Sequence, residues 1–347
     1  IDEVPYGEWG SVTSTFGEYS TAIVNISRDS GEGKDLTSYS AAESYASLLG
    51  EDGSCLSLTS AEIGVLEELT RLKKEGTIKK IIVTLNSSAT IQLDFLDRDT
   101  IDVDACLWIG NVGKNGISAV AEALTGEIVP SGKLSDTYLN NNFSSPAMMQ
   151  QSYNDGKKFM SAYGNGDKLT DSSQKYYGVY SEGIYVGYRY YETAWYEAEQ
   201  GNYADFDYDS AVVYPFGYGL SYTSFSWEIV DDSSLNGKEI SEDGSYTVTV
   251  KVTNTGRYPG KDVVQMYCGA PYTKGGIEKA YKVLCGFEKT PELYPSSENA
   301  AHPEDAADGK DKPNSCEITL TFTPYDVASY DYSDANENGF VGYGIDR

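Results

Sequence analysis

The period of the hydrophobic pattern changes along this chain, and that change limits the folds it can adopt. In the first half, short apolar runs of strand length alternate with amphipathic stretches of helical period. This alternation is typical of a mostly parallel sheet covered by helices. After Phe225, apolar residues recur at every second position in short runs between turns. Because that pattern is typical of an antiparallel β-sandwich, the sequence predicts an α/β domain followed by an all-β domain.

Three strand-to-helix units are visible in the first half. The clearest helix begins after Thr59, which forms a capping box with Glu62, and it stops at Gly76. The other predicted elements are the strands Ala22–Ile26, Ile81–Leu85 and Val103–Ile109 and the helices Ala41–Leu49 and Ile117–Leu124.

Two later segments lack this periodicity. Residues from about 146 to 175 are mostly small and polar, which predicts an irregular surface insertion. Residues 176–222 are rich in tyrosine, whose ring can be buried while its hydroxyl binds water or another polar group. This density indicates a seam between domains or a wall that faces sugar, and ordinary packing is the alternative for most of these tyrosines.

The second half shows strand patterns and no helical pattern. Its predicted strands are Tyr246–Thr253, Val263–Tyr267, Lys282–Phe287 and Cys316–Phe322. Residues 295–315 are predicted to form a long acidic loop between the last two of these strands.

The charge of the chain argues against several partners. Of its 347 residues, 26 are Lys or Arg and 53 are Asp or Glu, which gives a net charge of −27. Such a surface repels phosphate groups, so the sequence predicts no nucleic-acid partner and no anionic membrane partner. The chain also lacks the run of about 18 apolar residues that a membrane-spanning helix needs.

Cysteine and histidine content limits the chemistry. The five cysteines are scattered and odd in number, which predicts mostly free thiols and favours the cytoplasm over secretion or the periplasm. The single histidine, His302, leaves almost no material for a His-based metal site or a Ser-His-Asp triad. We therefore expect no metal and no cofactor, and carboxylates must carry any acid/base chemistry.

The loop after the first predicted strand contains the best candidate acid. Glu32 lies between Gly31 and Gly33, which let the backbone turn sharply and push the carboxyl into the open. A general acid needs such a projecting carboxyl with a raised pKa. The alternative is a solvated Gly-Glu-Gly turn, which spacing alone favours.

Glycines at positions 110, 113 and 116 form a second loop of interest. Their spacing, G-x-x-G-x-x-G, differs from the G-x-G-x-x-G of dinucleotide sites, and no acidic residue follows where a ribose partner would be expected. A tight turn between strand and helix is the better interpretation, which leaves a cofactor-dependent oxidoreductase as a distant third hypothesis.

Several motifs together resemble one known family. In chain order they are IVNISRDSGEGKDL, LTSAEIGVLEEL, KIIVTLNSSATIQL, VDACLWIGNVGKNGISAVAEALTGEIVPSGKLSDTY, EGIYVGYRYYE, YPFGYGLSYTSF, VTNTGRYPGKDVVQMY and LCGFEK. This collinear set covers nearly the whole chain and resembles glycoside hydrolase family three. The resemblance implies an α/β sandwich domain over residues 1–223, with the irregular insertion inside it, and a fibronectin-type-III-like β-sandwich over residues 224–347.

The resemblance also implies an activity and its residues. Family members of this kind are retaining β-glycosidases, and the family's Gly-Glu-Gly motif with a following Asp is matched by Gly31, Glu32, Gly33 and Asp35. The acid/base role therefore carries over to Glu32. Arg28 and Asp35 match neighbouring positions that we expect to shape the loop beside the substrate.

The family's nucleophile is missing from these residues. It is an aspartate in a Ser-Asp-Trp-like segment of a (β/α)8 barrel, and no Ser-Asp-Trp occurs in the sequence. A retaining glycosidase needs two carboxyl groups about 5–5.5 Å apart. The resemblance therefore implies a barrel elsewhere in the same gene product or in a partner chain, with a permuted domain order or a two-piece enzyme as the open alternatives.

The implied substrates are β-linked gluco- or xylo-oligosaccharides or aryl glycosides. A β-glucosidase, as in cellulose degradation, is the leading hypothesis, and a β-xylosidase is the closest variant. The competing class is a non-catalytic carbohydrate-binding or cell-surface adhesion module. Homo-oligomer formation stays open.

Overall fold

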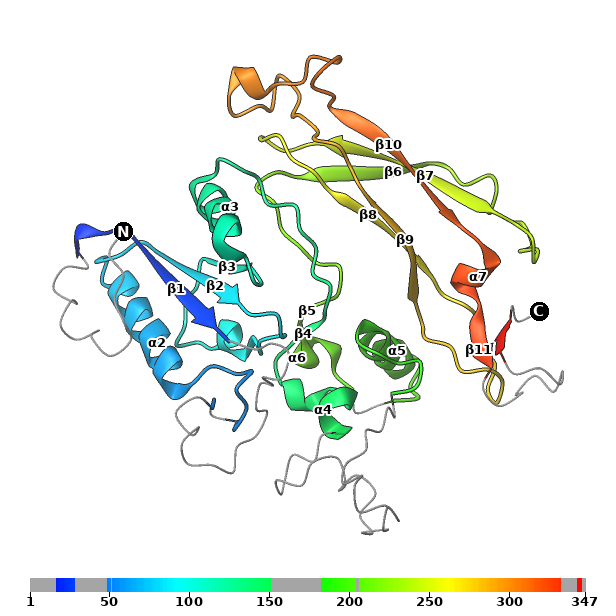
Figure 1. Cartoon of the computed structure of the whole chain (residues 1–347), viewed down its shortest axis with the longest axis horizontal. Helices are drawn as coiled ribbons and strands as arrows, with labels where there is room; N and C mark the ends of the chain where they lie inside the picture. The colour runs from blue at the N-terminus through cyan, green and yellow to red at the C-terminus, as the bar shows by residue number, and fades with distance from the viewer. Residues whose placement is uncertain are drawn as a thin grey trace, which may run out of the picture. The chain divides into compact units, whose positions relative to one another are not determined.

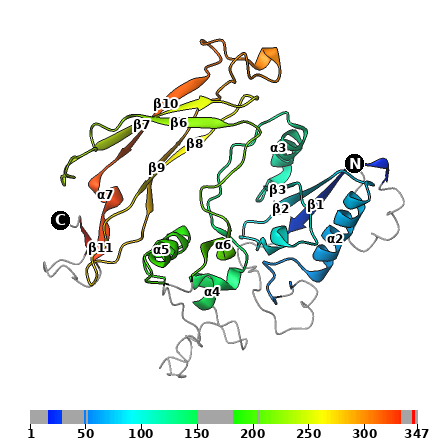
Figure 2. The same cartoon turned by 180° about the vertical axis from the view of Figure 1, so that it is seen from behind.

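The structure of the chain is a computed structural model that describes residues 17–28, 49–50, 52–150, 182–203, 206–331 and 342–344. The chain divides into two compact units, and each is described by itself (Figures 1 and 2). Unit 1 comprises Ile1–Ile117, Tyr138–Ser181 and Asp209–Val213, and unit 2 comprises Ser118–Thr137, Glu182–Tyr208 and Tyr214–Arg347. The predicted helix Ala41–Leu49 and most of the predicted insertion lie outside the described residues.

Unit 1 contains a parallel sheet in the strand order β1-β2-β3 (Figure 1). Its strands are β1 (Thr21–Ser27), β2 (Lys80–Asn86) and β3 (Ala105–Trp108). On the central strand, Ile81, Val83 and Leu85 are almost completely buried, which is expected of a parallel strand covered on its faces. All three predicted strands are confirmed, although β3 is shorter than predicted.

Helix α2 (Ser60–Lys74) packs against β1 and β2. The side chain of Thr59 accepts a hydrogen bond from the Glu62 amide, while the Glu62 carboxylate accepts one from the Thr59 amide at 2.8 Å. Gly76, with φ at +79°, takes the left-handed conformation after the last turn. The predicted capping box and helix end are confirmed.

Helix α3 (Gly113–Thr125) begins four residues before the predicted start. Gly110 and Gly113 both have positive φ, at +55° and +61°, so the chain turns within a few residues of β3. The glycines that made this segment look like a loop thus form both the turn and the first helical turn.

Short elements complete unit 1. They are the helices α4 (Pro146–Gln150) and α6 (Tyr208–Ala211) and the paired strands β4 (Tyr138–Leu139) and β5 (Val212–Tyr214). The first residue of α6 and the last residue of β5 belong to unit 2. Because α4 is helical, the prediction of an irregular segment from residue 146 was wrong for its first five residues.

The tyrosine-rich segment contains a helix that the sequence analysis missed, α5 (Tyr188–Glu199) in unit 2. Its aromatic residues are poor helix formers, and Gly187 precedes them with φ at +60°. Burial of Tyr191 and Ala194 compensates for that low intrinsic preference.

Unit 2 also contains two antiparallel sheets, one in the order β10-β7-β6 and the other pairing β8 with β9. Their strands are β6 (Phe225–Asp231), β7 (Tyr246–Asn254), β8 (Val263–Cys268), β9 (Val283–Lys289) and β10 (Ser315–Phe322). Alternate residues of the first sheet, among them Val250, Val252 and Ile318, join Val264 of β8 in one core. The four predicted strands are confirmed, and β6 is an addition.

The predicted absence of helices after Phe225 was wrong at one place. Pro324–Val327 forms the short helix α7, which Thr323 and Asp326 cap. Strands β11 (Ser329–Asp331) and β12 (Gly342–Gly344) pair after it. The acidic loop of residues 295–315 is confirmed, with one 3-10 turn at Pro303–Asp305.

The buried side chain of Asn254 ties the end of β7 to its surroundings. Its amide nitrogen donates to the carbonyls of Tyr258 and Leu293, each at 2.8 Å. Its oxygen accepts from the Thr223 hydroxyl and the Gly256 amide. All hydrogen-bonding groups of this amide are thus satisfied inside unit 2, as a buried polar group requires.

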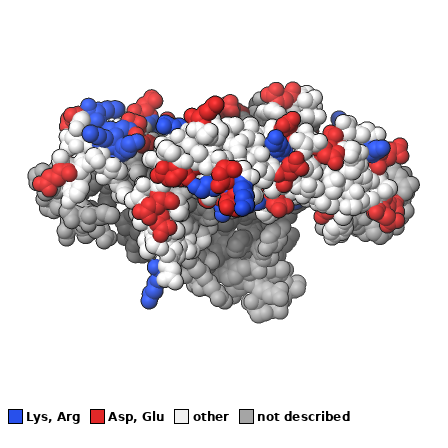
Figure 3. Space-filling model, turned by 90° about the horizontal axis from the view of Figure 1, so that it is seen from above, with Lys and Arg blue, Asp and Glu red and all other residues white. Residues whose placement is uncertain are grey.

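On the face shown in Figure 3, acidic and basic side chains are interspersed. All five cysteines are free thiols, which confirms the prediction of unpaired cysteines. In the parts of the chain that the structure describes, no helix combines the length and the apolar character needed to cross a bilayer.

Candidate functional site

Glu32, the predicted acid/base residue, lies outside the described residues. So do the two glycines beside it and Asp35. The structure describes the last residue before that loop, Arg28, which directly follows β1. It also describes the residues from 52 onward, through which the chain enters α2.

Arg28 links the end of β1 to the segment before α2. All five N–H groups of its guanidinium donate hydrogen bonds, which is the full donor capacity of an arginine. The acceptors are the carbonyls of Ser27, Cys55 and Ser57, at 2.9, 2.6 and 2.9 Å, and both carboxylate oxygens of Glu62, each at 2.8 Å. The guanidinium therefore has no donor left for a substrate, and among the described residues it joins the end of β1 to the segment before α2.

The ion pair between Arg28 and Glu62 is bidentate and mostly shielded from water. The side chains keep 10% and 21% of their surface exposed, respectively. Burial alone would raise the pKa of the Glu62 carboxyl, but hydrogen bonds from Arg28 and Thr59 outweigh burial and hold that pKa below its usual value of 4.5. The charge of Arg28 is thus neutralised within the fold.

This ion pair predicts a pH dependence of local stability. Because the folded pKa of Glu62 lies below its unfolded value, the stabilisation is present above about pH 4.5 and is lost as the pH falls through the folded pKa. Replacement Glu62→Gln keeps a side chain suited to the capping box and removes the charge. We expect faster hydrogen exchange of the α2 amides in this variant at neutral pH, and a smaller difference from the wild type at an acidic pH below the usual carboxyl value of 4.5. An equal difference at both pH values would contradict this role of the carboxylate.

The carboxyl-terminal edge of the parallel sheet carries a residue that sequence reasoning missed. The backbone amide of Arg28 donates to the Asn86 carbonyl at 3.1 Å, and the indole of Trp108 donates to the Ser87 carbonyl at 2.9 Å. The Trp108 side chain is 40% exposed at the end of β3. Its place at the end of a parallel strand, where α/β proteins bind ligands, was the available signal.

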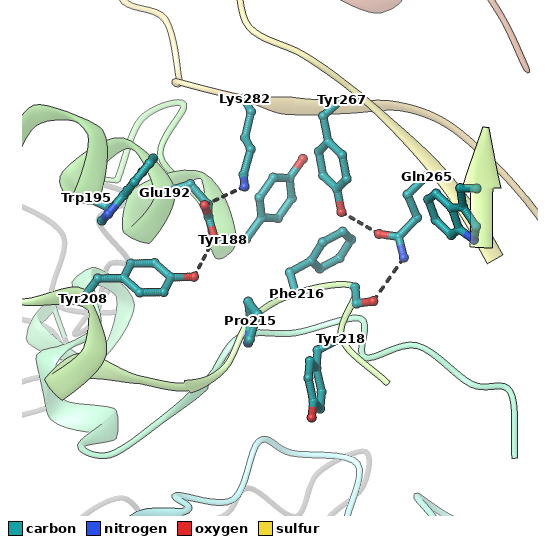
Figure 4. Close-up of a pocket in the computed structure, with 12 residues that line it drawn as sticks. Tyr188, Glu192, Trp195, Tyr208, Pro215, Phe216, Tyr218, Gln265, Tyr267 and Lys282 are labelled. Atoms are coloured by element: carbon teal, nitrogen blue, oxygen red, sulfur yellow. Dashed lines mark hydrogen bonds and ion pairs between the residues drawn. The ribbon is translucent and has the colours of Figure 1, made fainter. Parts of the chain in front are cut away.

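Unit 2 contains a pocket of about 500 Å³ (Figure 4). Its lining combines α5, the first residue of α6, the loop after β5, β6, β8 and the residue before β9. The lining residues are Tyr188, Glu192, Trp195, Tyr208, Pro215, Phe216, Gly217, Tyr218, Trp227, Gln265, Tyr267 and Lys282. They include several residues of the tyrosine-rich segment 176–222, which was predicted to form a seam between domains or a wall that faces sugar.

Stacked rings and one ion pair hold the pocket together. The ring of Tyr188 stacks on Phe216 with centroids 4.4 Å apart, and its hydroxyl accepts a hydrogen bond from the Leu284 amide. Opposite charges meet where Lys282 Nζ lies 2.7 Å from a carboxylate oxygen of Glu192. Burial raises the pKa of Tyr267 to about 12, and nearby Tyr188 and Glu192 contribute, so this phenol stays protonated.

Gly217 is required at the rim of this pocket. Its φ is +79°, and a Cβ there would collide with the side-chain amide of Gln265. The Gly217 carbonyl accepts a hydrogen bond from that same amide at 3.1 Å. The close approach explains the glycine within the YPFGYG motif.

Metal binding has no support in the described ranges, because no group of three or more His, Cys, Asp or Glu side chains there is arranged to hold an ion.

Comparison with known proteins identifies relatives of the chain. Residues 10–188, just over half of the sequence, match the family model described as the glycosyl hydrolase family 3 C-terminal domain. A β-glucosidase of Ruminococcus albus is 33% identical over 92% of this chain, and β-glucosidase A of Butyrivibrio fibrisolvens is 32% identical over 90%. The chain spans only 25% and 33% of those two proteins, respectively.

Solved structures show the same relationship. A β-glucosidase from Paenibacillus barengoltzii matches 97% of this chain with a TM-score of 0.68 and 28% identity, and the match covers 28% of that protein. β-Glucosidase 3B of Thermotoga neapolitana, in complex with α-D-glucose, matches 94% with a TM-score of 0.63 and 27% identity. The family match and these structural matches show that the chain belongs to glycosyl hydrolase family 3 and carries its C-terminal domain fold.

Proposed function

We propose that this chain supplies one half of the active site of a retaining β-glycosidase, with β-glucosides as the leading substrates. Glu32 serves as the acid/base, and the nucleophilic aspartate lies on a (β/α)8 barrel outside this sequence. Family membership and the names of the relatives support the proposal. The chain spans a quarter to a third of those relatives, which leaves room for a barrel. The non-catalytic adhesion module is not favoured, because the relatives are β-glucosidases.

The network around Arg28 is the single observation that carries the assignment of Glu32. Arg28 precedes the Gly-Glu-Gly motif by three residues, and its side chain binds the carbonyls of Cys55 and Ser57 in the segment before α2. The residue from which the chain enters that motif is therefore held firmly in the fold. A general acid needs a firmly held backbone beside it, because proton transfer requires that its carboxyl lie within hydrogen-bond distance of the departing oxygen.

The pairing of Arg28 with Glu62 also suits a general acid. An unpaired guanidinium near a carboxyl lowers its pKa, which would deprive Glu32 of its proton at neutral pH. Glu62 cancels that charge, and both partners are held within the fold. In the first step Glu32 protonates the leaving oxygen while the barrel aspartate attacks the anomeric carbon. In the second step Glu32 takes a proton from the water that releases the sugar.

The finer architecture belongs to the same proposal. We assign residues 1–223 to an α/β sandwich domain and residues 224–347 to a fibronectin-type-III-like sandwich. The core shared by β7, β10 and β8 supports the second assignment. Asp35 is proposed to shape the loop around Glu32.

A panel of aryl β-glycosides tests this function on the full-length protein. We expect cleavage of p-nitrophenyl β-glucoside to exceed that of the β-xyloside and the N-acetyl-β-glucosaminide. Proton NMR of the first-released sugar should show the β-anomer before mutarotation, because a double displacement retains configuration. Release of the α-anomer, or no cleavage of any member, would refute the proposal.

A further inference from the structure

The walls of the unit 2 pocket are partly exposed aromatic rings. Trp195 on α5 keeps 38% of its surface exposed, and Trp227 on β6 keeps 48%. Phe216 and Tyr218 add two further rings (Figure 4). Large aromatic surfaces inside a concavity of about 500 Å³ are typical of small-molecule sites. Flat rings of this kind stack on the C–H groups of a sugar ring.

The polar groups of the pocket retain hydrogen-bonding capacity. The Glu192 carboxylate accepts from Lys282 and from the Tyr208 hydroxyl, each at 2.7 Å, and two carboxylate oxygens have about four acceptor sites. Lys282 has three N–H donors and a side chain that is 37% exposed. A carboxylate beside an ammonium group offers an acceptor and a donor at the spacing of two neighbouring hydroxyls.

The charge balance of the pocket limits its ligand. Glu192 and Lys282 neutralise each other, and among the described residues no other Asp, Glu, Lys or Arg lines the pocket. A charged ligand would bury a charge without a partner, which is costly. A purely apolar ligand would cover the ion pair and leave its remaining donors and acceptors unsatisfied. The class of ligand that remains is a neutral molecule with flat apolar faces and several hydroxyls.

We propose that this pocket binds a neutral pyranose, as a single sugar or as the end unit of a short oligosaccharide. Trp195 and Trp227 supply stacking surfaces, and Glu192 with Lys282 supplies the hydrogen bonds. The described lining residues all belong to unit 2, and none of the contacts used above involves Glu32, so the inference goes beyond the proposed glycosidase function and stands without it.

Fluorine NMR of the full-length protein labelled with 5-fluorotryptophan tests the site locally. Trp195→Phe, Trp227→Phe and Trp108→Phe variants identify the resonances of these three among the tryptophans of the protein, and a saturating iminosugar fills any glycosidase site. On titration with methyl β-D-glucopyranoside, we expect saturable shifts at positions 195 and 227 and none at 108. Mannitol, which lacks a ring, and glucuronate, which is charged, should produce neither shift. Unmoved resonances, or equal shifts with mannitol, would overturn the proposal.

Two pocket variants separate the stacking contribution from the polar one. Trp195→Ala removes an exposed ring, and the double variant Glu192→Gln/Lys282→Met removes both charges together, so that neither is left buried alone. We expect each to weaken glucoside binding at least about tenfold, read from the position 227 resonance, with little change in the melting temperature. Tyr272→Ala, an exposed change outside the pocket, is the control. Wild-type affinity in both pocket variants would also reject the site, whereas failure of the glycosidase proposal would appear only in the aryl glycoside panel.

Discussion

Replacement Glu32→Ala in the full-length protein is expected to lower kcat/KM for a β-glucoside with a poor leaving group by about 10³-fold. Such a substrate needs a proton on its departing oxygen, and the variant has no acid to supply it. An activated dinitrophenyl glucoside needs little protonation, so its first step should remain fast. Its glycosyl-enzyme should then accumulate, because the base that activates water is also gone.

Added azide distinguishes this role from general damage. Azide is a nucleophile that needs no base, so it should attack the accumulated intermediate, restore turnover of the activated substrate and release β-glucosyl azide. Glu228→Ala, an exposed change on β6, serves as the control and should behave as the wild type. Equal losses on both substrates without azide rescue would remove Glu32 from the acid/base role.

The second large effect is expected from Arg28→Met. The variant leaves the largely buried Glu62 carboxylate without its charged partner and removes the Arg28 donors from three carbonyls. Breaking such a pair costs on the order of 3 kcal/mol. Loss of the Arg28 contacts should also displace Glu32. Misplacement of a catalytic group by about 1 Å can lower the rate about 10²-fold. We therefore expect both a lower melting temperature and a lower kcat well below that temperature.

Two comparisons keep this prediction specific. Arg71→Met breaks ion pairs with Glu68 and Glu75 on the exposed face of α2, so its melting temperature and kcat should stay near wild type. If Arg28 acts through Glu32, the acidic group in the kcat/KM profile of Arg28→Met should titrate at a shifted pH. A destabilised variant with an unchanged pH profile and unchanged kcat would limit Arg28 to a structural role.

The sequence predicted those elements whose local pattern and tertiary environment agree. The α2 helix has its capping box and apolar face in one short stretch, and β7 alternates buried and more exposed residues along its length. Helix α5 was missed because its tyrosines favour strands, and only packing against residues that follow much later, such as Tyr281, makes it a helix. Local propensity carries no information about such distant partners.

The candidate site was predictable to a similar degree. Arg28 was identified beside Glu32, but its pairing with Glu62, 34 residues away, depends on how the chain returns from the loop. The pocket of unit 2 joins Glu192 to Lys282 and Gly217 to Gln265. No spacing in the sequence indicates those pairs, because they meet only when separate strands and α5 assemble.

The buried amide of Asn254 has a consequence for the durability of the molecule. Deamidation would turn its donor nitrogen into an oxygen facing two carbonyl oxygens, and unit 2 would lose the contacts that join β7 to Leu293. That ageing reaction begins when the next backbone nitrogen attacks the side-chain carbon. Here that nitrogen, on Thr255, already donates to the Ser224 carbonyl at 2.9 Å. The fold thus slows chemical decay at an asparagine whose loss would cut these contacts.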